Sequence, residues 1–120
     1  MAPPTSLTEL AELARRAKFF IGSDTGPMHI AAAVGTPCVG LYGPMPATRC
    51  GPYGTQHIAL QNVAIAGKVK NRRRASNESM LAIGVEDVCA ACDMILSRRR
   101  LDVRESATDR APRFQTARAA

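Results

Sequence analysis

Four residues in the first quarter of the chain have groups that suit an anionic ligand: Asp24, Thr25, Gly26 and His29. Thr25 offers a hydroxyl and a backbone N–H, and the His29 imidazole is a further donor. Gly26 allows the backbone to approach a ligand closely. The Asp24 carboxylate repels phosphate, so we expect it to accept hydrogen bonds from sugar hydroxyls or from neighbouring backbone N–H groups. A ligand that carries both a diphosphate and a sugar satisfies all four residues.

The surrounding sequence predicts a strand, a polar loop and a helix that would position these residues. Residues 19–22 have the length and composition of a buried strand, and a proline in the first turn suits a helix over residues 27–34. That helix has little polarity and is expected to be buried on most sides, whereas its N-terminus exposes unpaired N–H groups and the positive end of the helix dipole. We therefore expect an anion site where the helix begins. Two simpler interpretations stay open: Asp24 and Thr25 only cap the helix, and His29 is only a structural histidine.

The remaining pattern predicts helices that alternate with strands. Ser6 and Glu9 form a capping-box pattern before a helix whose leucines recur on one face and which ends before Lys18. Gly35 suits the end of the second helix. Three further elements are expected: a strand over residues 37–42, a strand over 56–60 after a long glycine- and proline-rich loop over 43–55, and a closing helix over 85–96. This alternation is typical of an α/β fold, whose parallel sheet is covered by helices on both faces.

One stretch of the chain resembles a known family in several motifs that follow one another in the same order. These motifs are Asp24-Thr25-Gly26-Pro27-Met28-His29, Ala31-Ala32, Gly35-Thr36-Pro37, Val39-Gly40-Leu41-Tyr42-Gly43-Pro44 and Gly51-Pro52-Tyr53-Gly54. They resemble the C-terminal domain of family 9 glycosyltransferases, the ADP-heptose:lipopolysaccharide heptosyltransferases and their relatives. The resemblance extends from residue 6 to residue 97.

The resemblance implies a Rossmann-like domain, the C-terminal half of a GT-B fold, in an enzyme of lipopolysaccharide core synthesis. It further implies that the nucleotide sugar binds to Asp24, Thr25, Gly26, Met28 and His29. In such enzymes the other domain supplies the acceptor site and the catalytic base, so no catalytic residue is expected in this chain. The helix dipole and the hydrogen-bond donors would replace a metal ion, so neither a metal nor a cofactor is expected.

The length of the chain bears on this resemblance, because 120 residues suffice for one domain and a GT-B enzyme has two. We expect residues 1–5 to be a flexible lead, 6–97 the donor-binding domain and 98–120 a basic disordered tail. The first domain is expected to be absent, which leaves two interpretations: a truncated or misannotated reading frame, or a half that works with a partner chain. A nucleotide-binding module without catalysis is the alternative function.

The net charge of +6 lies largely in two arginine-rich segments. Residues 98–120 carry seven arginines against three acids, and a second basic cluster extends from Lys68 to Arg74. Solvated charge is the plain interpretation of both, and contact with nucleic acid or anionic lipid is the alternative; no aromatic residues are interleaved for base stacking. The sequence has no apolar run of 18 residues and no secretory-signal pattern at its start. We therefore expect a cytoplasmic protein with at most peripheral membrane contact.

The four cysteines are expected to be reduced and structural. Cys89 and Cys92 have the spacing of a metal or redox pair, but they lie in a helical pattern and are expected to be small buried thiols. Cys38 is predicted to lie in the core, and Cys50 belongs to the long loop.

Three residues of the long loop and the strand after it complete the set of candidates. Arg49 and Tyr53, in the loop after the strand over residues 37–42, are secondary candidates for ligand contact. His57 lies in a strand pattern without a partner in the sequence and is expected to be structural.

Overall fold

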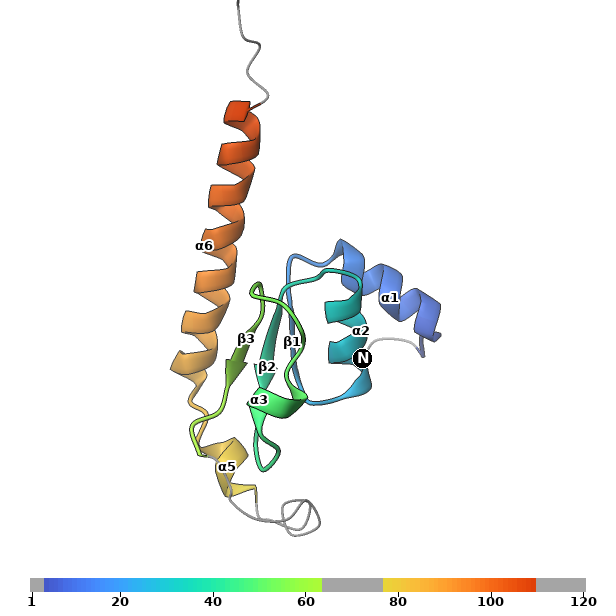
Figure 1. Ribbon diagram of the computed structural model, residues 1–120. Helices are drawn as coiled ribbons and strands as arrows, with labels where there is room; N and C mark the ends of the chain where they lie inside the picture. Colours follow the sequence, from blue (N-terminus) through green and yellow to red (C-terminus); the bar gives the residue numbers. More distant parts are fainter. Residues whose placement is uncertain (1–3, 64–76, 110–120) are drawn as a thin grey trace, which may run out of the picture.

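The computed structural model describes residues 4–63 and 77–109, and a sheet of three parallel strands in the order β1-β2-β3 forms its centre (Figure 1). The strands are β1 (Phe20–Ser23), β2 (Cys38–Leu41) and β3 (Ile58–Leu60). Phe20 pairs with Cys38, and Val39 pairs with Ile58. The parallel sheet confirms the predicted α/β class.

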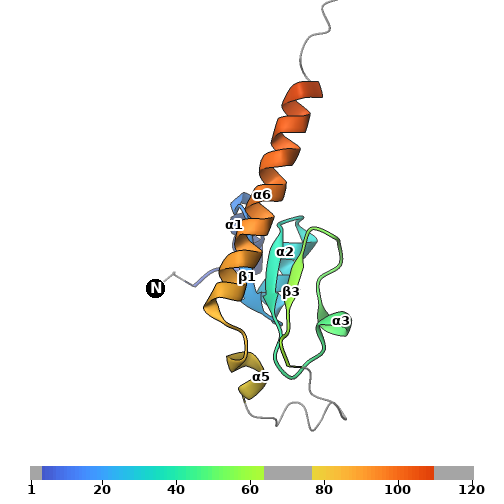
Figure 2. The same cartoon turned by 90° about the vertical axis from the view of Figure 1, so that its left-hand side faces the viewer.

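Helices cover both faces of this sheet. They are α1 (Leu7–Arg16), α2 (Gly26–Ala33), α3 (Ala47–Cys50), α5 (Glu78–Leu81) and α6 (Val85–Asp109). α2 packs on β1 and β2 with α1 against it, whereas α6 packs on β2 and β3. Figure 1 shows α6 on one side of the sheet and α2 with α1 on the other, and Figure 2 shows the same arrangement seen from the side of α6. The short helices α3 and α5 lie at the end toward which the strands point (Figure 1). These layers confirm a Rossmann-like arrangement.

The helix boundaries follow from local chemistry. At the start of α1 the Ser6 N–H donates to Glu9 Oε2 at 2.7 Å and the Glu9 N–H donates to Ser6 Oγ at 3.2 Å, which confirms the capping box. Gly35, after α2, has a φ of 86°, a left-handed conformation that glycine adopts without strain. The buried Thr36 hydroxyl then donates to the Ala14 carbonyl at 2.7 Å and ties the entry of β2 to α1.

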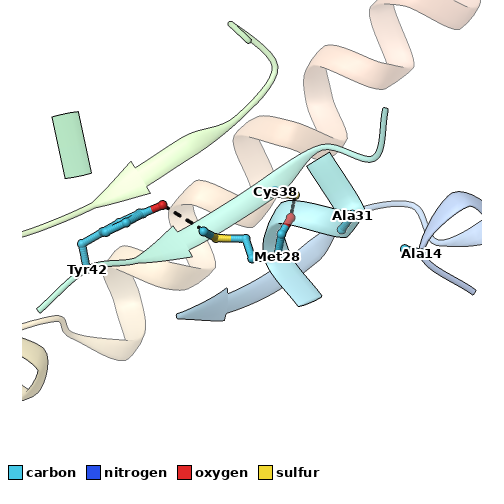
Figure 3. Packing of buried hydrophobic residues seen from close by; sticks show 5 residues of the cluster. All are labelled: Ala14, Met28, Ala31, Cys38 and Tyr42. Carbon is cyan, nitrogen blue, oxygen red and sulfur yellow. Dashed lines mark hydrogen bonds between the residues drawn. The ribbon is translucent and has the colours of Figure 1, made fainter. Parts of the chain in front are cut away.

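The core lies on the two faces of β2. Five buried residues form the cluster on the α2 face (Figure 3): Ala14, Met28, Ala31, Cys38 and Tyr42. On the α6 face, Val39 packs against Ala91 and Ile95. Burial raises the pKa of the Cys38 thiol to about 11, and its Sγ lies 3.2 Å from the Thr36 carbonyl. Cys38 is therefore an unreactive core residue, as predicted.

The length of α6 corrects the expected end of the closing helix. The sequence predicts a helix end near residue 96 and disorder from residue 98, but α6 continues to Asp109. A helix that is already nucleated extends at little cost through good helix formers such as arginine, leucine and glutamate. Residues 97–106 are exposed, which explains why this segment lacks apolar periodicity. Residues 110–120 and the basic cluster at Lys68–Arg74 lie outside the described residues.

The second half of α6 extends beyond the end of the sheet (Figure 1). Where the helix leaves the sheet, Arg99 Nη1 donates to the Lys18 carbonyl at 3.0 Å and holds α6 to the segment before β1. Neither α6 nor any other helix within residues 4–63 and 77–109 combines the length and the hydropathy needed to cross a membrane.

The cysteines on α6 differ from the expected buried thiols. The side of α6 that faces the sheet carries Ala91 and Ile95, four residues apart. Cys92 lies beside this side and is half-buried, whereas Cys89 is exposed, so the prediction of a buried Cys89 was wrong. Cys50, in α3, is half-buried, and all four cysteines are free.

Candidate functional site

The turn between β1 and α2 brings the predicted site residues to the carboxyl end of the sheet. Thr25 is the N-cap of α2, with extended backbone, and its carbonyl accepts from the N–H groups of Met28 and His29 at 3.1 and 3.4 Å. Pro27 occupies the first turn, where its missing N–H leaves no helical bond unmade. The helix thus begins directly after Asp24 and Thr25, as predicted.

The Thr25 hydroxyl does not cap the helix. It donates to the Ser23 carbonyl at 3.3 Å, and α2 has no side-chain cap. The Gly26 N–H has no hydrogen-bond partner within residues 4–63 and 77–109, and a Cβ built on Gly26 would meet no atom within 4 Å. The start of α2 therefore offers an unused donor and open space, which a purely capping role of Thr25 leaves unexplained.

Asp24 and His29 form a pair across the beginning of α2. Asp24 Oδ1 lies 2.9 Å from His29 Nε2, and the side chains of Asp24 and His29 are 27% and 48% exposed. We assign a proton to Nε2 from this contact, which leaves Nδ1 as an acceptor in the neutral ring and a donor in the charged ring. Asp24 Oδ2 has no hydrogen-bond partner in the described part of the chain and stays available to a hydroxyl group. The sequence-based partners of Asp24 did not include His29.

Met28, which the resemblance includes among the nucleotide-sugar-binding residues, has a buried side chain in the structure. Met28 has no exposed surface: its side chain points into the core beside Cys38 and Tyr42 (Figure 3). The Tyr42 hydroxyl lies 3.8 Å from Met28 Sδ. The Met28 N–H is already bonded to Thr25, so neither its side chain nor its donor is available. Met28 anchors the helix, and the accessible candidates are the other four residues.

An open cavity of about 480 Å³ lies beside the Asp24–His29 pair. Ala32 and Ala33 of α2 continue its first wall. The opposite wall comes from the loop after β2: Arg49, Cys50, Gly51, Pro52 and Tyr53. We call this cavity the α2 groove. It brings the secondary candidates Arg49 and Tyr53 together with the pair, whereas Thr25 and Gly26 lie at the helix start outside its lining.

A second cavity, of about 690 Å³, lies away from the predicted site, at the ends where the strands begin. Three arginines are among its lining residues: Arg15, Arg98 and Arg99. Although this cavity is larger, none of the predicted site residues lines it. Open parallel sheets bind ligands beyond the carboxyl ends of their strands, so the α2 groove is the better candidate.

Two residues hold the loop and strand beside the α2 groove, and the sequence did not indicate their contacts. His57 Nδ1 accepts from the Cys38 N–H at 3.1 Å, which confirms a structural role but supplies a partner that the sequence did not show. Burial lowers the pKa of His57. Gln61 donates to the Gly43 and Met45 carbonyls, both at 2.8 Å. A lone glutamine after a strand carries no signal for such a role.

The described residues contain no group of three or more His, Cys, Asp or Glu side chains that could hold a metal ion. The groups that could engage a ligand at the start of α2 are instead the Gly26 N–H, the Thr25 hydroxyl and the Asp24–His29 pair.

Comparison with known proteins matches this chain to heptosyltransferases. The family model described as glycosyltransferase family 9 (heptosyltransferase) matches residues 1–81. Lipopolysaccharide heptosyltransferase 3 of Escherichia coli is 34% identical over 97 residues, which are 80% of this chain and 28% of that protein. Lipopolysaccharide heptosyltransferase 1 of Salmonella typhimurium is 40% identical over 66 residues, or 52% of this chain and 21% of that protein.

A solved structure agrees with these sequence matches. The crystal structure of the glycosyl transferase family 9 from Veillonella parvula superposes with a TM-score of 0.67 at 29% sequence identity, over 77% of this chain and 27% of that one. The chain therefore spans less than a third of the length of each of these relatives.

Proposed function

Because this chain belongs to glycosyltransferase family 9, we propose that the start of α2 binds the nucleotide-sugar donor of a heptosyltransferase-like enzyme of lipopolysaccharide core synthesis. The observation that carries the proposal is the position of the Asp24–His29 pair. The pair lies at the carboxyl end of a parallel strand, beside an uncapped helix N-terminus and in the lining of an open groove. Phosphate groups bind at such helix starts through backbone N–H groups and the helix dipole.

The proposed donor is an ADP-heptose-like molecule, and each accessible residue has a distinct part in holding it. The Gly26 N–H donates to the diphosphate, and the Thr25 hydroxyl exchanges its bond to the Ser23 carbonyl for one to the diphosphate. Asp24 uses Oδ1 to hold His29 and Oδ2 to accept from a sugar hydroxyl. As the glycosidic bond breaks, negative charge grows on the diphosphate, and preorganised donors at the helix start oppose that charge. In this proposal the helix dipole and these donors stabilise the charge of the leaving diphosphate without a metal ion or a cofactor.

Transfer itself needs groups that this chain does not offer in the proposed site. The acceptor must be held in line with the donor and its hydroxyl deprotonated, and positioned acid–base groups contribute roughly 100- to 10,000-fold to typical rates. Asp24 is engaged with His29 and the donor, so we propose that the acceptor-binding half of such an enzyme supplies the base. The chain alone is expected to release no ADP from ADP-heptose in the presence of a heptose-deficient lipopolysaccharide acceptor.

Calorimetric titration of the 120-residue chain with ADP tests the donor site. Thr25→Val removes a donor at the exposed helix start and should weaken ADP binding by roughly 10- to 150-fold, the range for a hydrogen bond to a charged group. The matched control is Thr36→Val, which removes a buried hydroxyl bonded to the Ala14 carbonyl. The control should lower the melting temperature and leave the affinity of the folded protein unchanged. A folded wild-type chain that binds no ADP would refute the proposal.

A nucleotide-binding module without catalysis is the second candidate, because the proposed site holds a donor while its acid, Asp24, is engaged with His29. This function keeps the donor site. It is favoured over the first if ADP binds normally but no acceptor-dependent turnover appears when a matching family 9 first domain is added.

A further inference from the structure

We propose that Arg49, which lines the α2 groove, is the charge partner of the donor diphosphate at the start of α2, and that a braced loop holds it in place. The proposal rests on the proposed donor site and adds to it a residue from the opposite wall of the groove. Its basis is the charge of the groove, the unpaired Arg49 side chain and the rigid backbone of the loop that carries it.

The charge balance of the groove calls for a cation. Asp24 is the acid in its lining, and His29 is bonded to it. A diphosphate that approaches the start of α2 therefore meets a carboxylate at close range, and the helix dipole offsets only about half of one charge. Arg49 is the arginine in the lining of the same groove, across from this pair. A guanidinium is always charged and its planar fork matches phosphate oxygens.

The Arg49 side chain is free to take this part. It is exposed, and its guanidinium has no hydrogen-bond or ion-pair partner within residues 4–63 and 77–109. By contrast, Arg16 bonds Glu12 at 2.8 Å and Arg99 bonds the Lys18 carbonyl at 3.0 Å. Arg49 therefore lines the groove that contains the Asp24 carboxylate, and its guanidinium makes no hydrogen bond or ion pair with the described residues.

Side-chain hydrogen bonds hold the loop that carries Arg49, although this loop is not paired with the sheet. Gln61 accepts from the Ala47 N–H at 3.1 Å and donates to the Gly43 and Met45 carbonyls. This one amide thereby fixes both the entry to α3 and its first residue.

A second brace fixes the exit of the same loop. The buried Tyr42 hydroxyl donates to the Cys50 carbonyl at 3.2 Å, directly after Arg49. The Gly51 N–H donates to the Ala47 carbonyl at 2.8 Å, and a Cβ on Gly51 would lie 2.5 Å from that oxygen, so the path requires glycine. Fixing a charged wall before the ligand arrives lowers the ordering cost of binding.

The test compares Arg49→Gln with wild type in calorimetric titrations with ADP and with adenosine. Arg49→Gln should weaken ADP binding by roughly 10- to 150-fold and change adenosine binding less than twofold. Arg49→Lys keeps the charge but loses the planar guanidinium, so its ADP affinity should lie between those of wild type and Arg49→Gln. Arg98→Gln, at the far cavity, is the charge-matched control and should bind ADP like wild type.

Gln61→Ala separates positioning from direct contact. It should weaken ADP binding when Arg49 is present and have little further effect in the Arg49→Gln background, because both changes remove the same interaction. Circular dichroism confirms that each variant is folded.

The outcomes distinguish the two proposals. If wild type binds ADP and Arg49→Gln binds it equally well, the role of Arg49 is refuted while the donor site stands. If Arg49→Gln and Arg98→Gln weaken binding alike, the effect is one of overall charge and Arg49 has no special role. If wild type does not bind ADP at all, both proposals fail.

Discussion

Replacing Gly26 by alanine should stabilise the fold and weaken donor binding at the same time. An ideal Cβ at this position meets no atom within 4 Å, and Gly26 is not among the glycines with positive φ. Where alanine fits the backbone, exchange for glycine gains about 0.4–1 kcal/mol, mainly from the unfolded chain. For a domain of 60–100 residues, 1 kcal/mol corresponds to roughly 4–8 °C in melting temperature. We therefore expect Gly26→Ala to melt a few degrees higher than wild type.

The same methyl group would occupy the open space where we place the diphosphate. Loss of the Gly26 N–H contact should cost about 1.5–3 kcal/mol of binding free energy, the value for a hydrogen bond to a charged group. The assay is thermal unfolding with and without ADP, followed by calorimetric titration. Gly40→Ala is the control, because its Cβ would lie 2.6 Å from Tyr42 Cε2 and should destabilise the core instead. A Gly26→Ala chain that binds ADP as tightly as wild type would refute close backbone approach at this residue.

Two further predictions concern pH and thiol chemistry. Burial lowers the folded-state pKa of His57 below 6.5, so the unfolded chain binds more protons there and the free energy of unfolding should fall as the pH drops below 6.5. Chemical denaturation should show a smaller difference in this free energy between pH 5 and pH 7.5 for His57→Asn than for wild type, and equal differences would contradict the assignment. In timed alkylation at pH 8 read by mass spectrometry, the exposed Cys89 should react first and Cys38, whose pKa is raised to about 11, last, and early modification of Cys38 in folded protein would show that its burial is wrong.

Local chemistry along the sequence determined most of the fold. The Ser6–Glu9 capping box and the left-handed Gly35 act within a few residues, and their partners are close in sequence. The start of α2 was predictable for the same reason, since Pro27 follows a polar loop after an apolar strand. These signals also placed Asp24, Thr25 and Gly26 at one helix start, which is the basis of the proposed site.

Packing between distant elements decided which of those residues are available. Met28 belongs to the same motif as His29, but the contact of α2 with β2 turns it into the core. Cys89 and Cys92 share a helix, and only the docking of α6 on the sheet decides which of the two is exposed. The last part of α6 has helical propensity but no apolar periodicity, so the sequence did not indicate that the helix extends to Asp109.

The groove itself exists only in the tertiary structure. Arg49 is far from Asp24 in the sequence, and the two line one cavity because parallel strands end at the same edge of the sheet. The hydrogen bonds of Gln61 that fix the intervening loop join residues 14 to 18 positions apart. The sequence alone determined the helix start and its donors, whereas the opposing charged wall depends on contacts that form only when the strands pair and the loop folds back on them.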